Sequence, residues 1–162
     1  MDKEPERKKV YSKKEGFLKA CNYCAYQERS QNEVRSKLYD LGLYPSDVEL
    51  VISDLIQENF INEERFANAY TSGKFRIKGW GKKKIKQGLL LKRVPEKIIA
   101  NALKKIDETQ YLEKLSQLLL KKKDLLKEKN QLKERYKLTQ YALLKGYESD
   151  LISDVLNNNK LT

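Results

Sequence analysis

Histidine is absent from the 162 residues of the chain, and glycine (7), proline (3), cysteine (2) and tryptophan (1) are scarce. Without histidine, the chain lacks the commonest general base near neutral pH. So few glycines and prolines argue against a fold rich in β-hairpins. The sequence also has no apolar run of about eighteen residues, and its first residues are too polar for a secretion signal. We therefore expect a helix-rich, cytoplasmic protein that does not contact a membrane.

Catalytic motifs are missing as well. The sequence has no glycine-rich phosphate loop, no nucleophile elbow and no recognisable pair of carboxylates. Most acids fall at expected helix starts, where capping explains them. We predict that the protein is not an enzyme and that it takes no cofactor and no small-molecule substrate.

The two cysteines, Cys21 and Cys24, are spaced Cys-x-x-Cys inside an apolar helical pattern. A structural zinc site needs four ligands, and the chain has no histidine and no other cysteine to complete one. A redox pair usually lies at the start of a helix that follows a strand, which this pattern does not offer. We interpret both residues as core thiols; a zinc ion shared between two copies is the alternative.

Positive charge is what the chain has in excess: 34 Lys and Arg against 23 Asp and Glu, a formal net charge of +11. Between Glu64 and Glu96 there is no acid, whereas ten basic residues fall there, Arg65, Lys74, Arg76, Lys78, Lys82, Lys83, Lys84, Lys86, Lys92 and Arg93. A helix that begins near Lys82 carries three ammonium groups in its first turn, where each cation costs roughly 0.3–1 kcal/mol. This arrangement favours a polyanion or an acidic protein as partner; a solvated basic face is the alternative.

Helical spacing places Lys83, Lys86 and Leu90 on one face, away from Ile85 and Leu89. A basic face with one exposed leucine suits a protein groove lined with acids beside DNA phosphate. Trp80, between two glycines, either stacks on a nucleobase or fills the seam between helical units, and we favour the seam.

Three other features have structural interpretations. Phe66 and Tyr70 are expected to pack inside or between units, and Arg65 to pair with Glu63, Glu64 or a buried carbonyl. The second basic cluster, Lys121–Lys123 and Lys127, is interleaved with acids, and intrahelical pairs such as Asp124 with Lys127 would absorb its charge.

The apolar pattern predicts a layout of three helices that occurs three times. After a mobile tail over residues 1–12, we expect three-helix units over 13–60, 61–107 and 108–162. Ser30 to Glu33 and Ser46 to Glu49 read as capping boxes. Matching apolar positions recur about fifty residues apart: Val34, Leu38 and Leu43; Ile85, Leu89 and Val94; Leu138, Ala142 and Tyr147. Such self-similarity is typical of tandem arrays, so we predict an elongated, curved all-α molecule; a single compact bundle is the alternative.

Three segments resemble the bacterial RecX family, regulators of the RecA recombinase: RSQNEVRSKL (29–38), INEERFANAY (61–70) and GWGKKKIKQGLLLKRV (79–94). The resemblance implies tandem three-helix repeats, binding in the groove of the RecA filament on single-stranded DNA, and inhibition of ATP hydrolysis and strand exchange. The sequence departs from the family pattern at Lys92-Arg93-Val94, where the family usually has Lys-Gly-Ile. The glycine that would end the basic helix is therefore missing.

Together these features predict a monomeric regulator of RecA that acts in DNA repair, recombination and the SOS response. Its partners would be the RecA filament and single-stranded and double-stranded DNA. The expected contacts are Lys74, Arg76, Lys78, Lys82, Lys83, Lys84, Lys86, Lys92 and Arg93. A nucleic-acid-binding protein that acts without RecA, or an adaptor for another acidic protein, is the alternative.

Overall fold

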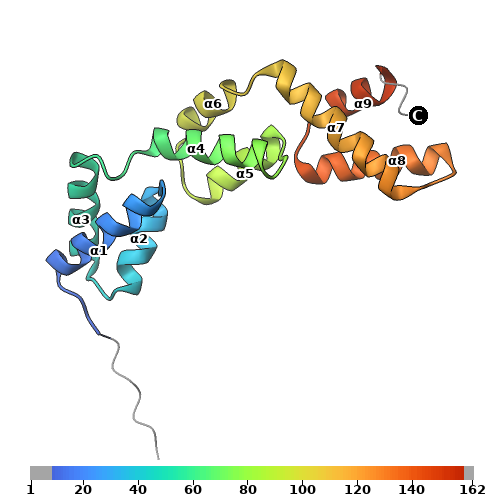
Figure 1. The fold of residues 1–162 in the computed structure, drawn as a ribbon. Helices are drawn as coiled ribbons and strands as arrows, with labels where there is room; N and C mark the ends of the chain where they lie inside the picture. Colours follow the sequence, from blue (N-terminus) through green and yellow to red (C-terminus); the bar gives the residue numbers. More distant parts are fainter. Residues whose placement is uncertain (1–8, 159–162) are drawn as a thin grey trace, which may run out of the picture. The chain divides into compact units, whose positions relative to one another are not determined.

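In the computed structural model, which describes residues 9–158, these residues form nine α-helices and no strand (Figure 1). The all-α class is therefore confirmed. By their contacts the residues divide into two compact units, the first ending at Phe66 and the second beginning at Ala67. The helices are α1 (Lys13–Tyr26), α2 (Gln31–Asp40), α3 (Pro45–Gln57), α4 (Glu63–Arg76), α5 (Lys82–Leu91), α6 (Glu96–Lys104), α7 (Glu108–Leu126), α8 (Gln131–Lys145) and α9 (Ser149–Asn158).

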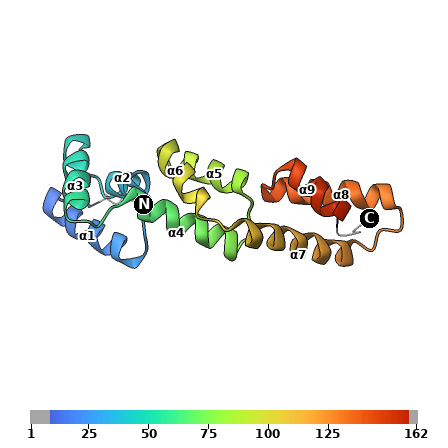
Figure 2. The same cartoon turned by 90° about the horizontal axis from the view of Figure 1, so that it is seen from above.

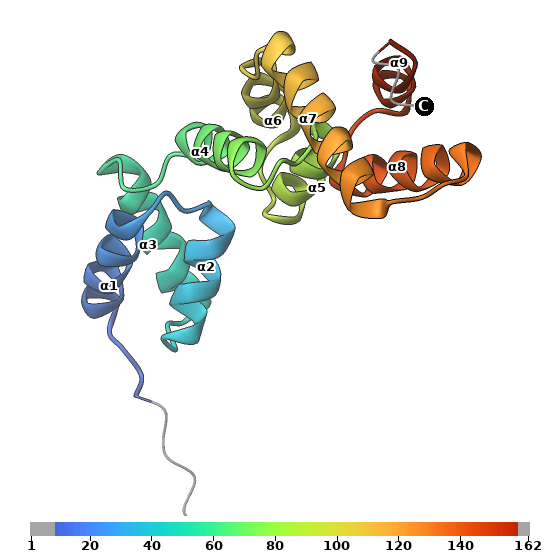
Figure 3. The same cartoon turned by 45° about the vertical axis from the view of Figure 1, so that its right-hand side comes forward.

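The first unit is built on α1, α2 and α3, which pack around one another (Figure 3). The predicted capping box at the start of α2 is confirmed, because Ser30 Oγ accepts the Glu33 N–H at 3.1 Å and Glu33 accepts the Ser30 N–H at 2.9 Å. The box predicted at Ser46 is wrong. Helix α3 begins at Pro45, with Tyr44 rather than Ser46 as its N-cap. The missing N–H of proline suits a first turn, and Glu49 instead binds Arg35 at 2.7 Å.

The predicted tail, residues 1–12, is only partly covered, since residues 1–8 lie outside the described range. Tyr11 is half-buried against the first core, and its N–H donates to the Leu41 carbonyl at 3.3 Å. Ser12 caps α1 through a capping box with Glu15. Tyr11 and Ser12 therefore belong to the first unit, and their assignment to the tail was wrong.

Helices α2, α5 and α8 end in the same way. A residue just beyond each helix has a positive φ: 82° at Gly42, 58° at Arg93 and 95° at Gly146. The following N–H then donates back to the helix: Leu43 to Leu38, Val94 to Leu89 and Tyr147 to Ala142, at 3.1–3.3 Å. All nine apolar positions used to predict the repeat are at most 5% exposed. The predicted recurrence is confirmed at each of these positions, and Arg93 adopts the conformation that glycine would supply.

In the second unit, α7 lies alongside α8 and α9 (Figure 2), and α5 packs on α6. The core behind these helices includes Phe75, Ile85, Leu89, Ile99, Tyr111, Leu115, Leu119, Leu138 and Ile152. Within residues 9–158, no helix is both long enough and apolar enough to span a membrane.

Cys24 lies in the first core with 8% exposure, and burial raises its pKa to about 11. Cys21 is half-buried, and burial raises its pKa as well. The core interpretation thus fits Cys24 fully and Cys21 in part. In the described part of the chain, no three His, Cys, Asp or Glu residues are grouped so that they could hold a metal ion.

Candidate functional site

The predicted basic residues lie on the last turn of α4, the loop before α5, and the two ends of α5. Helix α5 begins at Lys82 as predicted, with Gly81 as its N-cap, and no acid lies in its first turn. Lys92 and Arg93 follow its other end, about 15 Å away at 1.5 Å per residue. The structure therefore gathers most of the set near the start of α5 and leaves Lys92 and Arg93 apart from it.

The outward face of α5 is as predicted. Ile85 and Leu89 are fully buried, whereas Lys83 and Lys86 are exposed and Leu90 is 40% exposed. Neither lysine side chain forms an ion pair with a carboxylate of residues 9–158. This surface, Lys83, Lys86 and Leu90, is called the α5 face below.

Trp80 is half-buried and lies between two lysines. Lys74 Nζ and Lys84 Nζ are 4.7 and 4.6 Å from its ring centroid, and Tyr70 meets it edge-on at 6.5 Å. Cation–π attraction holds both ammonium groups near the indole. Two cations predicted as separate contacts thus form one cluster with the only tryptophan, and whether that cluster binds a base stays a prediction.

The seam between the middle and last groups of helices is made by the glycines beside Trp80. A methyl group on Gly81 would approach a Gly146 backbone atom to 2.4 Å, which no side chain could accept. Two backbone hydrogen bonds cross here: Gly81 N–H to the Lys145 carbonyl at 2.8 Å and Lys83 N–H to the Gly146 carbonyl at 3.0 Å. The start of α5 is therefore tied directly to the end of α8.

Two tyrosine rings fill this seam, Tyr111 and Tyr147, with centroids 5.1 Å apart and both fully buried. Tyr147 donates its hydroxyl to the Gly79 carbonyl at 3.1 Å. The Tyr111 hydroxyl accepts the Lys82 N–H at 2.9 Å and donates to Glu148 at 2.7 Å. Burial is the main cause that raises the pKa of both phenols. The sequence alone favours Trp80 as the residue that fills the seam and gives no indication of these rings.

Lys82 forms an ion pair within the chain. Its ammonium pairs with Glu108 at 2.5 Å and lies 4.7 Å from the Tyr111 ring centroid, with 22% of its side chain exposed. Much of its charge is thus offset internally, and it is the weakest member of the predicted set.

Two lysines that the sequence analysis missed lie beside the loop. Lys114 Nζ donates to the Arg76 carbonyl and Lys145 Nζ to the Lys78 carbonyl, both at 3.2 Å. They are 38 and 67 residues away along the chain, so no local pattern could have indicated them. The side chains of Arg76 and Lys78 are exposed next to these ammonium groups.

Arg65 is a structural residue of the first unit. Its Nε binds Glu28 at 2.8 Å, and its terminal nitrogens donate to the Asn59 side chain and carbonyl at 3.0 and 3.1 Å. The carbonyl that it contacts is exposed rather than buried as predicted, and its acidic partner is Glu28 rather than Glu63 or Glu64. Glu63 instead accepts the Gln31 N–H at 2.6 Å, and burial is the main cause that raises its pKa.

The packing interpretation of Phe66 and Tyr70 agrees with the structure. Phe66 is 5% exposed, and Tyr70 is half-buried with its hydroxyl beside Gly88 of α5. In the second basic cluster, Lys123 lies 3.5 Å from Glu134, and Glu128 binds Lys137 at 2.7 Å. Within this cluster, Lys123 thus pairs with an acid of α8, whereas the predicted pairs lie within one helix.

Comparison with known families matches this layout. The first, second and third three-helix domains of RecX match residues 17–55, 62–103 and 108–156. The fold therefore defines a protein of three tandem three-helix domains, the arrangement that the sequence predicted. The chain belongs to the RecX family.

Known relatives agree with this assignment. The chain is 27% identical over 144 residues to Regulatory protein RecX of Bacillus mycoides (strain KBAB4), and 28% identical to that of Bacillus thuringiensis (strain Al Hakam). Each alignment covers 89% of this chain and 53% of the relative, so the chain spans about half the length of the curated relatives it matches. The crystal structure of RecX from Lactobacillus salivarius is similar at a TM-score of 0.83, with 27% identity over 93% of this chain and 97% of that one.

Proposed function

We propose that the chain regulates the RecA recombinase by binding in the groove of the RecA filament on single-stranded DNA, and that it acts there as an inhibitor. The observation that carries this proposal is the α5 face, where two lysines that pair with no acid of residues 9–158 lie beside an exposed leucine. The name Regulatory protein RecX of its relatives supports a regulatory role. In this proposal the protein is a monomer, acts in the cytoplasm in repair, recombination and the SOS response, and catalyses no reaction.

The proposed mechanism is steric and electrostatic. Lys83 and Lys86 would meet filament carboxylates or DNA phosphate, while Leu90 would add apolar contact area. Because hydrogen bonds and buried tyrosines tie α5 to the last domain, the face would dock as part of one unit. A protein seated in the groove would then obstruct the second DNA strand.

A charge-reversal variant tests this proposal. Lys83→Glu with Lys86→Glu should raise the concentration for half-inhibition of RecA ATPase on single-stranded DNA by about tenfold or more. Both residues are exposed, so circular dichroism should not change, and the melting temperature should not fall because an acid in the first turn of α5 is favourable. The matched control is Lys121→Glu with Lys129→Glu, which makes the same change in net charge on exposed residues of the last domain. Full inhibition by the first variant would remove the α5 face from the site, and equal loss in both would reduce the effect to net charge.

A second candidate function is nucleic-acid binding without RecA, favoured by the cluster of Trp80, Lys74 and Lys84. Stacking of a base on an indole contributes ~1–3 kcal/mol. If about five phosphates are neutralised, log affinity for a bare single strand should fall with log salt at a slope of roughly −3.5. At equal salt, we expect RecA-coated strands to bind more tightly than bare ones; equal affinity would favour this second function.

A further inference from the structure

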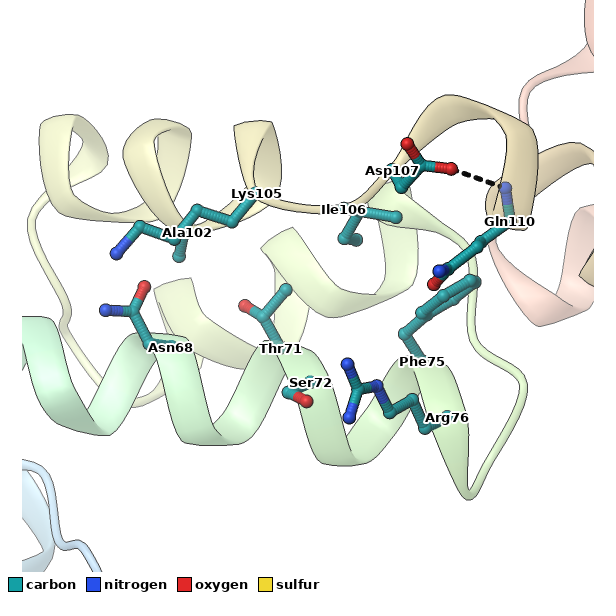
Figure 4. A pocket seen from close by; sticks show the side chains of 10 residues that line it. All are labelled: Asn68, Thr71, Ser72, Phe75, Arg76, Ala102, Lys105, Ile106, Asp107 and Gln110. Carbon is teal, nitrogen blue, oxygen red and sulfur yellow. Dashed lines mark hydrogen bonds between the residues drawn. The ribbon is translucent and has the colours of Figure 1, made fainter.

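A pocket of about 360 Å³ lies in the second unit and does not involve the α5 face (Figure 4). Its walls come from one side of α4, the end of α6 and the start of α7. Phe75, Ala102 and Ile106 form an apolar lining and are each at most 8% exposed. The volume is near the lower end of the roughly 300–1,000 Å³ usual for small-ligand sites. The pocket therefore suits one compact group rather than a long peptide.

Two buried oxygens in this pocket have no hydrogen-bond partner. Thr71 is 3% exposed, and neither its Oγ1 nor Asn68 Oδ1 meets a donor or acceptor among residues 9–158. Both side chains rise from α4 toward α6, into the pocket (Figure 4). Buried polar atoms almost always have partners, because an unsatisfied one is costly. A ligand that supplies N–H groups at this depth would satisfy both oxygens.

The rim of the pocket is basic. Arg76 and Lys105 are exposed there, and neither pairs with a carboxylate of residues 9–158. The one acid of the lining, Asp107, is engaged in capping α7, since its Oδ1 accepts the Gln110 N–H at 2.9 Å. A suitable ligand thus combines N–H donors at one end with negative charge at the other.

We propose that this pocket binds one adenine nucleotide. The Asn68 amide would accept from the adenine N6 amino group and donate to N7, a bidentate pairing that asparagine makes with this base. The Thr71 hydroxyl would accept the second N6 proton, and Arg76 and Lys105 would bind the phosphate. The nucleotide is either a unit of a DNA strand, in which case the inference rests on the proposed function, or a free nucleotide.

Other small anionic groups fit the pocket less well. A carboxylate side chain of a partner would satisfy Arg76 and Lys105 but would bring no donor to Asn68 Oδ1. Guanine presents two acceptors, O6 and N7, on the edge where adenine presents a donor and an acceptor. Thymine has no exocyclic amine, so dTMP is the matched ligand control.

The test is an NMR titration of the ¹⁵N-labelled full chain with dAMP, dTMP and a short oligo-dA strand. We expect dAMP to shift resonances around residues 68–76 and 102–110 and to bind at least fivefold more tightly than dTMP. Asn68→Ala should weaken dAMP binding by about fivefold to a hundredfold, the range for one bidentate base contact. Tighter binding of oligo-dA than of dAMP at this pocket would identify a strand as the source, and equal binding would identify the free nucleotide.

Thr71→Val distinguishes a binding role from a structural one. This substitution keeps the side-chain shape and removes the unsatisfied hydroxyl, so we expect weaker dAMP binding with an unchanged or higher melting temperature. The matched control is Thr139→Val on α8, where Oγ1 donates to the Arg135 carbonyl at 2.8 Å and nucleotide binding should not change. A lower melting temperature with full dAMP binding would overturn the proposal, as would equal dTMP binding or no shifts at several millimolar dAMP.

Failure of the pocket and failure of the proposed function give different results. Lys83→Glu with Lys86→Glu should leave dAMP binding intact, because neither residue lines the pocket. Inhibition of RecA by wild type without any nucleotide shifts would overturn the pocket alone. Nucleotide shifts in a protein that has no effect on RecA would overturn the proposed function and leave the pocket supported.

Discussion

Gly81→Ala should destabilise the second unit through a single steric contact. Gly81 has an ordinary φ of −79°, so alanine adds no backbone strain there. Its methyl group would nevertheless lie 2.4 Å from a Gly146 backbone atom, so the backbone segments at Gly81 and Gly146 would have to separate. Losing two backbone hydrogen bonds costs about 0.5–1.5 kcal/mol each. Repacking of the tyrosine rings beside them adds about 1 kcal/mol, the low end for an overpacked core. We expect a total loss of about 2–4 kcal/mol.

Equilibrium unfolding in urea, followed by tryptophan fluorescence, measures this loss. Trp80 is the only tryptophan and is adjacent to the substituted residue. The matched control is Gly73→Ala, because a methyl group on Gly73 would meet nothing within 4 Å. Gly73 lies inside α4, where alanine should stabilise by about 0.5–1 kcal/mol. If Gly81→Ala unfolds at the same urea concentration as Gly73→Ala, the close approach of the two backbones does not exist and the account of the seam is refuted.

Three further predictions concern backbone strain, acid stability and thiol reactivity. Arg93→Gly should raise the free energy of unfolding by about 0.5–1 kcal/mol, since relief of left-handed strain of ~1–2 kcal/mol exceeds the entropy gained by the unfolded chain; a fall in the urea midpoint would contradict it. The hydrogen bond from Arg35 lowers the pKa of Glu49, so this carboxylate contributes stability above its unfolded pKa of about 4.3 and loses it as pH falls through the lower folded value. Glu49→Gln should therefore flatten the fall in melting temperature on acidification, and a profile unchanged from wild type would count against the pair. With a pKa of about 11, Cys24 should resist iodoacetamide at pH 8 until the chain unfolds, whereas Cys21 should react first; early labelling of Cys24, detected by mass spectrometry, would contradict its burial.

Local signals in the sequence account for most of the fold. The Ser30 box acts within the first turn of α2, so the helix start that it predicts agrees with the structure. The apolar repeat could also be predicted from the sequence, because helical periodicity determines which positions are buried. One failure occurred where two local signals competed. At Ser46, the proline one residue earlier determined where α3 begins.

The candidate site was predictable only where it follows one helix. The α5 face came from the 3.6-residue period, which requires no knowledge of other segments. Lys114 and Lys145 contact residues that are 38 and 67 positions away in the sequence. The packing of Gly81 on Gly146 likewise joins residues that are distant in the sequence. The pocket at Thr71 could not be predicted from the sequence for a related reason. A threonine in an amphipathic helix carries no sign that its hydroxyl will be buried without a partner.

The seam also changes the electrostatic argument drawn from the start of α5. From the sequence alone, three lysines at a helix N-terminus favour a polyanion or an acidic protein as partner. In the structure, the N–H of Lys83 is bonded to the Gly146 carbonyl at the end of α8, so the negative end of one helix dipole meets the positive end of another. The Lys82 N–H is bonded to Tyr111, which in turn binds Glu148.

Part of the compensation for those cations is therefore internal, and the helix end itself is not a free anion site. The case for an acidic partner rests instead on Lys83 and Lys86, whose ammonium groups are not neutralised by these internal contacts. That is why charge reversal at these two positions, rather than at Lys82, is the substitution that separates binding from folding.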